Sequence, residues 1–200
     1  MLEFDAEGHV YRWNGEQKPG VTQIIRTALG NPFARVAGGV LETARQRGNA
    51  VHRACELDDA GNLDESSLDA RIVPYVEAWR DFRHAFRFEV LFSEMPLYMP
   101  VYDFAGTPDC VVRFDDERFG VIDRKSGLPG RAAALQTVAY AMLVRPMLGD
   151  GEVVGCQIRR FALQMQANGN YRLHEYTSPR DWPDFLACLT VLRLKERISA

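Results

Sequence analysis

The alternation of apolar and polar positions predicts both helices and strands. After a short helix near Thr22, apolar residues recur at helical spacing in four stretches, which predicts helices over 33–58, 66–86, 131–144 and 178–198. Aromatic and β-branched residues dominate other stretches and predict strands over 88–99, 153–166 and 171–176. The pattern therefore predicts an α/β (α+β) fold, in which a central mixed sheet is flanked by helices.

The first residues predict a small separate element. Strand-like residues stand at 2–4 and 10–13, and Asn14-Gly15 is a typical turn signal. With 200 residues the chain is long enough for one domain with a full core. We expect a single domain over 1–200 with a small N-terminal hairpin over about 1–19.

The stretch FAGTPDCVVRFDDERFGVIDRKSG, residues 104–127, predicts a hairpin of two strands. A loop at 115–117 places Asp109 directly opposite Asp123. Carboxylates that lie opposite each other repel unless a cation lies between them. The hairpin therefore predicts a site for a divalent cation, although a solvated acidic pair on an exposed sheet face is the alternative.

Lys125 adds a positive charge to this place. Side chains alternate along a strand, so Asp123 and Lys125 share one face and Arg124 lies on the other. Acidic oxygens that hold a hard cation, with an ammonium group beside them, are what metal-dependent phosphodiester hydrolysis needs.

Four motifs follow one another in a characteristic order. They are Gly48-Asn-Ala-Val-His52, Gly106-Thr-Pro-Asp109, the stretch IDRKSG around Asp123, and Gln136-Thr-Val-Ala-Tyr140. In this order the sequence resembles the RecB-like exonuclease branch, of phage and bacterial type, in the PD-(D/E)xK nuclease superfamily. Arg124 departs from that branch, which usually has an aromatic residue there.

The resemblance implies a restriction-endonuclease-like core and a function. The function is Mg²⁺- or Mn²⁺-dependent exonuclease action on DNA in recombination or repair. A recombination partner protein and a homo-oligomer are compatible with it. An endonuclease of the same superfamily and a non-catalytic nucleic-acid-binding module that keeps the fold are the alternatives.

The resemblance also implies roles for individual residues. Asp109, Asp123 and Lys125 are the expected catalytic residues. His52, Asp109, Asp123 and the backbone carbonyl of Arg124 are the expected metal ligands. Glu56 lies one helical turn after His52 and is a candidate partner of its second ring nitrogen, with a solvated side chain as the alternative. The residues expected to support the site or contact the substrate are Glu56, Glu94, Gln136, Tyr140 and Arg131.

Charge and cysteine content limit this interpretation. A net charge of −3 and a pI near 5.8 do not indicate a nucleic-acid-binding protein, so positive charge must be concentrated locally. The candidate basic rim is formed by Arg45, Arg47, Arg53, Arg124 and Arg131. The cysteines, Cys55, Cys110, Cys156 and Cys188, lack the C-x-x-C spacing, which predicts neither an iron–sulfur cluster nor a disulfide framework.

The sequence also bears on where the chain acts. It has no run of about eighteen apolar residues that would span a membrane. The first residues lack the basic and apolar regions of a secretory signal. We therefore expect a cytoplasmic protein without a membrane partner.

Overall fold

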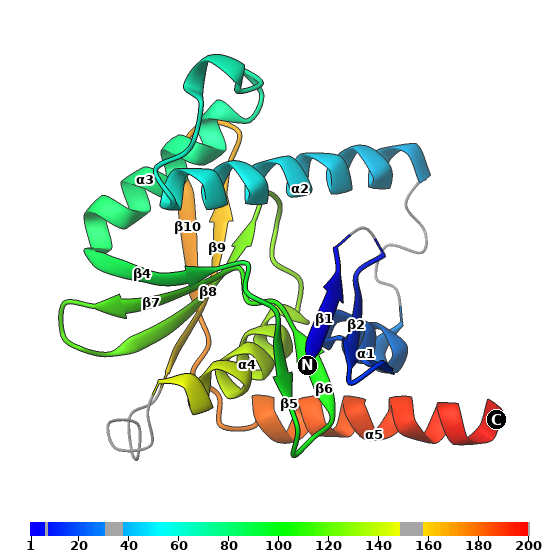
Figure 1. The fold of residues 1–200 in the computed structure, drawn as a ribbon. Helices are drawn as coiled ribbons and strands as arrows, with labels where there is room; N and C mark the ends of the chain where they lie inside the picture. Colours follow the sequence, from blue (N-terminus) through cyan, green and yellow to red (C-terminus); the bar gives the residue numbers. More distant parts are fainter. Residues whose placement is uncertain (7, 31–37, 149–157, 200) are drawn as a thin grey trace.

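A mixed sheet of five strands forms the centre of the protein (Figure 1). The computed structural model describes residues 1–6, 8–30, 38–148 and 158–199. The strand order is β10-β9-β8-β7-β4; β8 and β9 are parallel and the other neighbours antiparallel. The strands are β4 (Phe88–Ser93), β7 (Cys110–Phe114), β8 (Phe119–Lys125), β9 (Arg159–Met165) and β10 (Tyr171–Glu175).

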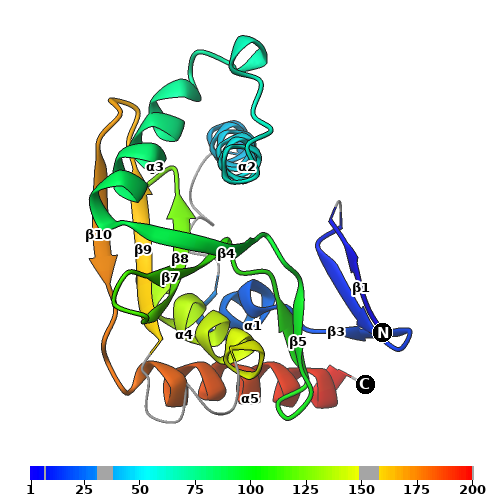
Figure 2. The same ribbon diagram turned by 60° about the vertical axis from the view of Figure 1, so that its left-hand side comes forward.

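Helices cover both faces of this sheet, as Figures 1 and 2 show. The helices α2 (Gly38–Asp59) and α3 (Val73–Phe86) cover one face, where Val51 and Trp79 pack with Val112 and Ile122. The other face carries α1 (Val21–Leu29), α4 (Ala133–Val144) and α5 (Asp181–Ser199). The predicted central mixed sheet flanked by helices is confirmed.

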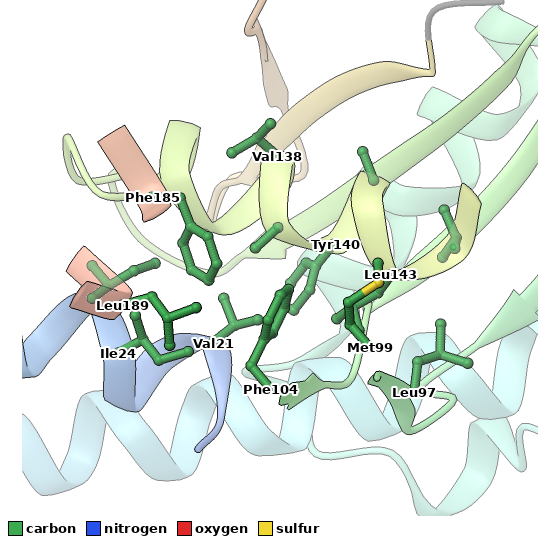
Figure 3. Packing of buried hydrophobic residues seen from close by; sticks show 14 of the residues in the cluster. Val21, Ile24, Leu97, Met99, Phe104, Val138, Tyr140, Leu143, Phe185 and Leu189 are labelled. Atoms are coloured by element: carbon green, nitrogen blue, oxygen red, sulfur yellow. The ribbon is translucent and has the colours of Figure 1, made fainter. Parts of the chain in front are cut away.

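The core on the α4 side joins elements that are far apart in the sequence. Val21, Phe104, Tyr140 and Phe185 belong to one buried cluster, shown in Figure 3. Two short strands, β5 (Leu97–Met99) and β6 (Phe104–Gly106), form a hairpin beside it. Val111 of β7 and Val121 of β8 belong to the same cluster, so it fixes α4 against the sheet.

The N-terminal element has three strands rather than the predicted two. They are β1 (Leu2–Asp5), β2 (Val10–Trp13) and β3 (Glu16–Lys18). Asn14 and Gly15 connect β2 to β3 with φ values of 52° and 84°, as a tight hairpin turn requires. Trp13 stacks on Tyr98, with ring centroids 4.6 Å apart, so this sheet contacts the β5–β6 hairpin.

Two predicted elements are interrupted. The helix expected from 66 begins only at Val73, after a 3₁₀ turn at Glu65–Ser67. Pro74 explains the late start, because it has no N–H group and fits only the first turn of a helix. The strand expected over 88–99 breaks after β4, where Glu94 has a φ of 50°.

Other boundaries shift by a few residues. The helices expected from 131 and 178 begin at Ala133 and Asp181, and a 3₁₀ turn at Arg145–Met147 follows α4. Residues 33–37 and 153–157, where predicted elements begin, and Cys156 lie outside the described residues. Within the described ranges, no helix combines the length and apolar character that crossing a membrane requires.

Candidate metal centre and its surroundings

The β7–β8 hairpin brings two of the predicted carboxylates together. Its strands pair in the predicted register, with Cys110 opposite Ile122, and one further step places Asp109 across from Asp123. Asp109 lies just before the first residue of β7, and its Oδ2 accepts a hydrogen bond of 2.7 Å from the main-chain N–H of Arg124. Only 5% of Asp109 and 0% of Asp123 is exposed, so both carboxylates are removed from bulk water.

His52, Glu94 and Asp109 form a group that could hold a metal ion. One ligand atom from each lies within 4.8 Å of the other two. His52 Nδ1 lies 3.1 Å from Glu94 Oε1 and 3.6 Å from Asp109 Oδ2. Its Nε2 lies 2.8 Å from the carbonyl oxygen of Arg124. The group therefore takes one residue from each of three places: His52 from α2, Glu94 from the segment after β4, and Asp109 from the β7–β8 hairpin.

Asp123 lies next to this group and is paired with Lys125. Asp123 Oδ1 accepts a hydrogen bond of 2.8 Å from Lys125 Nζ. Asp123 Oδ2 is buried and has no hydrogen-bond partner among the described residues. A buried carboxylate oxygen without a partner is costly, and it is also a free ligand atom. The predicted role of Asp123 as a metal ligand remains a prediction.

Lys125 connects this pair to helix α4. Its Nζ donates to Gln136 Oε1 at 3.2 Å, and Gln136 Nε2 donates to the Tyr140 hydroxyl at 3.0 Å. Tyr140 is itself packed in the core cluster of Figure 3. The Gln136 and Tyr140 motif thus holds the ammonium of Lys125 in place.

The site has an excess of buried negative charge. Burial is the main cause that raises the pKa of Asp123 to about 6; Asp109 raises it further and Lys125 opposes the shift. Burial also raises the pKa of Asp109, and Glu94 adds to that shift while His52 opposes it. Carboxylates this close resist ionising together. A divalent cation would remove this conflict.

The two basic groups stay charged more readily than usual. Burial lowers the pKa of His52, but the carboxylates of Asp109 and Glu94 outweigh it and raise the pKa above its ordinary value. Burial likewise lowers the pKa of Lys125, and Asp123 and Asp109 raise it by more. Lys125 is therefore an ammonium ion at neutral pH.

Of the two alternatives for Glu56, the structure does not show the contact with His52. Glu56 Oε2 accepts a hydrogen bond of 2.6 Å from Arg53, while the ring nitrogens of His52 face Glu94 and Arg124. Helical spacing places Glu56 and His52 on one side of α2, but Glu94 approaches from another segment and lies nearer.

Arg131 is exposed just before α4 and remains a predicted substrate contact.

The Arg124 side chain does not belong to a basic rim, because it is fully buried on the α2–α3 side of the sheet. Tyr11 also lies beside the site. Burial raises the pKa of Tyr11 to about 12, and Glu94 and Asp109 add to the shift, so the N-terminal sheet adjoins the site. Its hydroxyl lies 2.9 Å from Thr107 Oγ1. No motif in the sequence indicated this residue.

Comparisons with known proteins give only weak similarities. No model of a protein family matches the chain, and no curated protein matches it either. The crystal structure of SSO0001 has 14% sequence identity and a TM-score of 0.40, over 87% of this chain and 72% of that chain. LHK-Exo, solved in complex with dAMP, has 14% identity and a TM-score of 0.31, over 91% of this chain and 93% of that chain.

Proposed function

We propose that this chain is a Mg²⁺- or Mn²⁺-dependent deoxyribonuclease that hydrolyses phosphodiester bonds. One observation carries the proposal: His52, Glu94 and Asp109 converge within 4.8 Å, beside the buried Asp123–Lys125 pair. Oxygen-rich sites with one imidazole suit hard divalent cations. The donor set, together with the unpaired oxygen of Asp123, fits such an ion.

The residues have separate tasks in this proposal. Glu94, Asp109 and His52 would hold the cation together with the carbonyl of Arg124, and Asp123 would complete the set. When bound, the cation supplies positive charge that stabilises negative charge on the reacting phosphate. Lys125, whose side chain is 28% exposed, donates to a phosphate oxygen. Asp123 and Gln136 orient that ammonium.

The assignment of an exonuclease activity, in DNA recombination or repair, rests on the sequence motifs. Their order, from the Gly48–His52 stretch to the Gln136–Tyr140 stretch, supports a single exonuclease domain over 1–200 that acts on DNA in recombination or repair. A recombination partner protein and a homo-oligomer belong to the same proposal, as does a cytoplasmic location.

Digestion of DNA tests the activity. End-labelled linear duplex and closed circular DNA are incubated with Mg²⁺, with Mn²⁺ or with a chelator. We expect labelled nucleotides from the linear DNA, no cleavage of the circle, and no cleavage with the chelator. Cleavage of the circle would show an endonuclease, and binding without any cleavage would show a non-catalytic module. The absence of both DNA binding and DNA cleavage would overturn the proposal.

Calorimetry with Mn²⁺ tests the metal centre separately. Asp109→Ala should weaken Mn²⁺ binding by about tenfold or more, because it removes a ligand atom from the group. Asp116→Ala is the matched control, since Asp116 lies at the far turn of the same hairpin and pairs with Arg118. Equal affinity in both variants would remove Asp109 from the centre.

A further inference from the structure

The buried guanidinium of Arg124 is the most unusual feature behind the metal centre. Arg124 is 0% exposed, and its side chain leaves β8 on the face opposite Lys125. Its neighbours on that face, Cys110, Val112 and Ile122, are apolar and pack with α2 and α3. An apolar residue would suit this position by its surroundings, so the charge needs another explanation.

The guanidinium donates to the backbone that carries the metal-binding carboxylates. Nη2 of Arg124 lies 2.5 Å from the carbonyl oxygen of Asp109 and 2.5 Å from Ser93 Oγ. Ser93 Oγ and the N–H of Glu94 donate to the same carbonyl at 2.8 and 3.2 Å. Three donors therefore meet at the main chain of Asp109, and one of them is the amide of Glu94.

Glu94 depends on this junction because its backbone is in an unfavourable conformation. Its φ is 50°, in the left-handed region that costs energy for residues other than glycine. The hydrogen bond from its N–H to Asp109 helps to hold that conformation. The conformation in turn directs the Glu94 side chain toward His52.

Asp59 holds the guanidinium from the other side. Its Oδ2 accepts from Arg124 Nη1 at 2.9 Å, and its Oδ1 accepts from Trp79 Nε1 at 2.8 Å. Asp59 is the last residue of α2 and its side chain is 4% exposed. A carboxylate at a helix C-terminus is disfavoured by the helix dipole. Two arginines offset this cost, because Arg83 Nη1 also donates to Asp59 Oδ1 at 3.2 Å.

We propose that Arg124 is a positioning residue that sets the spacing of Asp109, Glu94 and its own carbonyl for the metal ion. A buried ion pair seldom adds more stability than well-packed apolar residues, but it can impose one geometry. Arg124 Nε has no hydrogen-bond partner among the described residues, so the arrangement is not optimised for stability. The two guanidinium nitrogens Nη1 and Nη2 donate to Asp59, to Ser93 and to the carbonyl of Asp109. This inference rests on the proposed function.

Two variants separate this role from simple stability. Arg124→Lys keeps the positive charge beside Asp59, but a single ammonium cannot reproduce the planar set of donors. The double variant Arg124→Met with Asp59→Asn removes both charges and leaves neither one buried alone. Arg160→Met with Asp181→Asn is the matched control, because this pair, 2.8 Å apart, is also largely buried and joins β9 to α5.

Two measurements need no turnover. In the metal-free protein, the amide of Glu94 should exchange its hydrogen about tenfold faster in both Arg124 variants, because its acceptor is no longer fixed. Mn²⁺ affinity should fall by about 10- to 100-fold, the effect of losing a residue that orients metal ligands. In cleavage assays kcat should fall while the KM for DNA stays within about threefold.

The control variant should keep wild-type values in all three measurements, even where its melting temperature falls. Wild-type exchange at Glu94 and wild-type Mn²⁺ affinity in both Arg124 variants would overturn the inference. A wild-type protein that neither binds Mn²⁺ nor cleaves DNA would instead overturn the proposed function. In that case the exchange of the Glu94 amide still decides whether Arg124 holds this backbone.

Discussion

At the scale of single residues, Lys125 is the cation best placed to contact a substrate. It lies between Asp123 and Gln136, at hydrogen-bond distances of 2.8 and 3.2 Å, and part of its side chain remains exposed. A compact ammonium held in this way can donate to a phosphate oxygen beside His52, Glu94 and Asp109. In the proposed reaction, we expect its contribution to belong to the transition state more than to the bound substrate.

Replacing this lysine should slow cleavage without much loss of binding. Lys125→Ala should reduce the single-turnover rate by about 10²-fold or more, the effect of removing one donor that stabilises a transition state. DNA affinity, measured in Ca²⁺, should change little because one phosphate contact among several is lost. Lys125→Arg should rescue poorly, since a planar guanidinium differs from a point charge.

Lys195→Ala serves as the control for this experiment. Lys195 lies on α5 and donates to the carbonyl of Thr27, away from the metal group. If Lys125→Ala cleaves as fast as Lys195→Ala, Lys125 has no part in the reaction.

At the scale of elements, the contact of β6 with α1 and α4 leaves no room for a side chain. A Cβ atom at Gly106 would lie 2.8 Å from Val21 Cγ2, 2.9 Å from Leu143 Cδ1 and 3.1 Å from Tyr140 Cε1. Tyr140 is also the residue whose hydroxyl binds Gln136. Close packing here therefore links the core to the position of Lys125.

A methyl group at this position should disturb both stability and activity. Gly106→Ala should lower the free energy of unfolding by about 1–3 kcal/mol, the usual cost of overpacking a core. Urea unfolding measures this loss. Cleavage should also slow, because the ring of Tyr140 must move.

Gly130→Ala is the matched control, because a Cβ atom there would have no neighbour within 4 Å. Equal stability of the two variants would show that α1 and α4 can shift apart without cost.

At the scale of the whole molecule, the net charge is negative. The proposed binding of DNA therefore requires positive charge to be concentrated locally. Two arginines of the predicted rim are already paired on α2, Arg45 with Glu42 at 2.9 Å and Arg53 with Glu56 at 2.6 Å. Arg47 and Arg131 have no ion pair within the part of the chain that the structure describes. Of these two, Arg131 is exposed and is the better candidate for a phosphate contact.

DNA binding should therefore weaken as salt rises, and Arg131 should contribute to that dependence. Arg131→Ala should reduce the slope of log affinity against log salt by about one, the value for one lost phosphate contact. Arg45→Ala should have a smaller effect because Glu42 already neutralises that charge. Titration at several salt concentrations, with Arg172→Ala on β10 as the control, measures this. A slope that Arg131→Ala leaves unchanged would place the DNA elsewhere.

The sequence by itself determined the local geometry of the site. The register of the β7–β8 hairpin follows from the alternation of side chains and a short loop, so Asp109 could be placed opposite Asp123. The Asn14-Gly15 turn and the separation of Lys125 from Arg124 onto opposite faces follow from the same kind of local rule. These features depend on neighbours within one hairpin.

Only the tertiary structure decided which distant groups meet. Glu94, rather than Glu56, faces His52, because the fold brings the left-handed residue just after β4 beside α2. The first half of α2 shows the same limit: Val40 is apolar but 64% exposed. Periodicity identifies which side of an element is apolar. Which element covers that side, and which charged groups pair, depends on contacts between segments far apart in the sequence, because local periodicity reflects only the neighbours within one helix or strand.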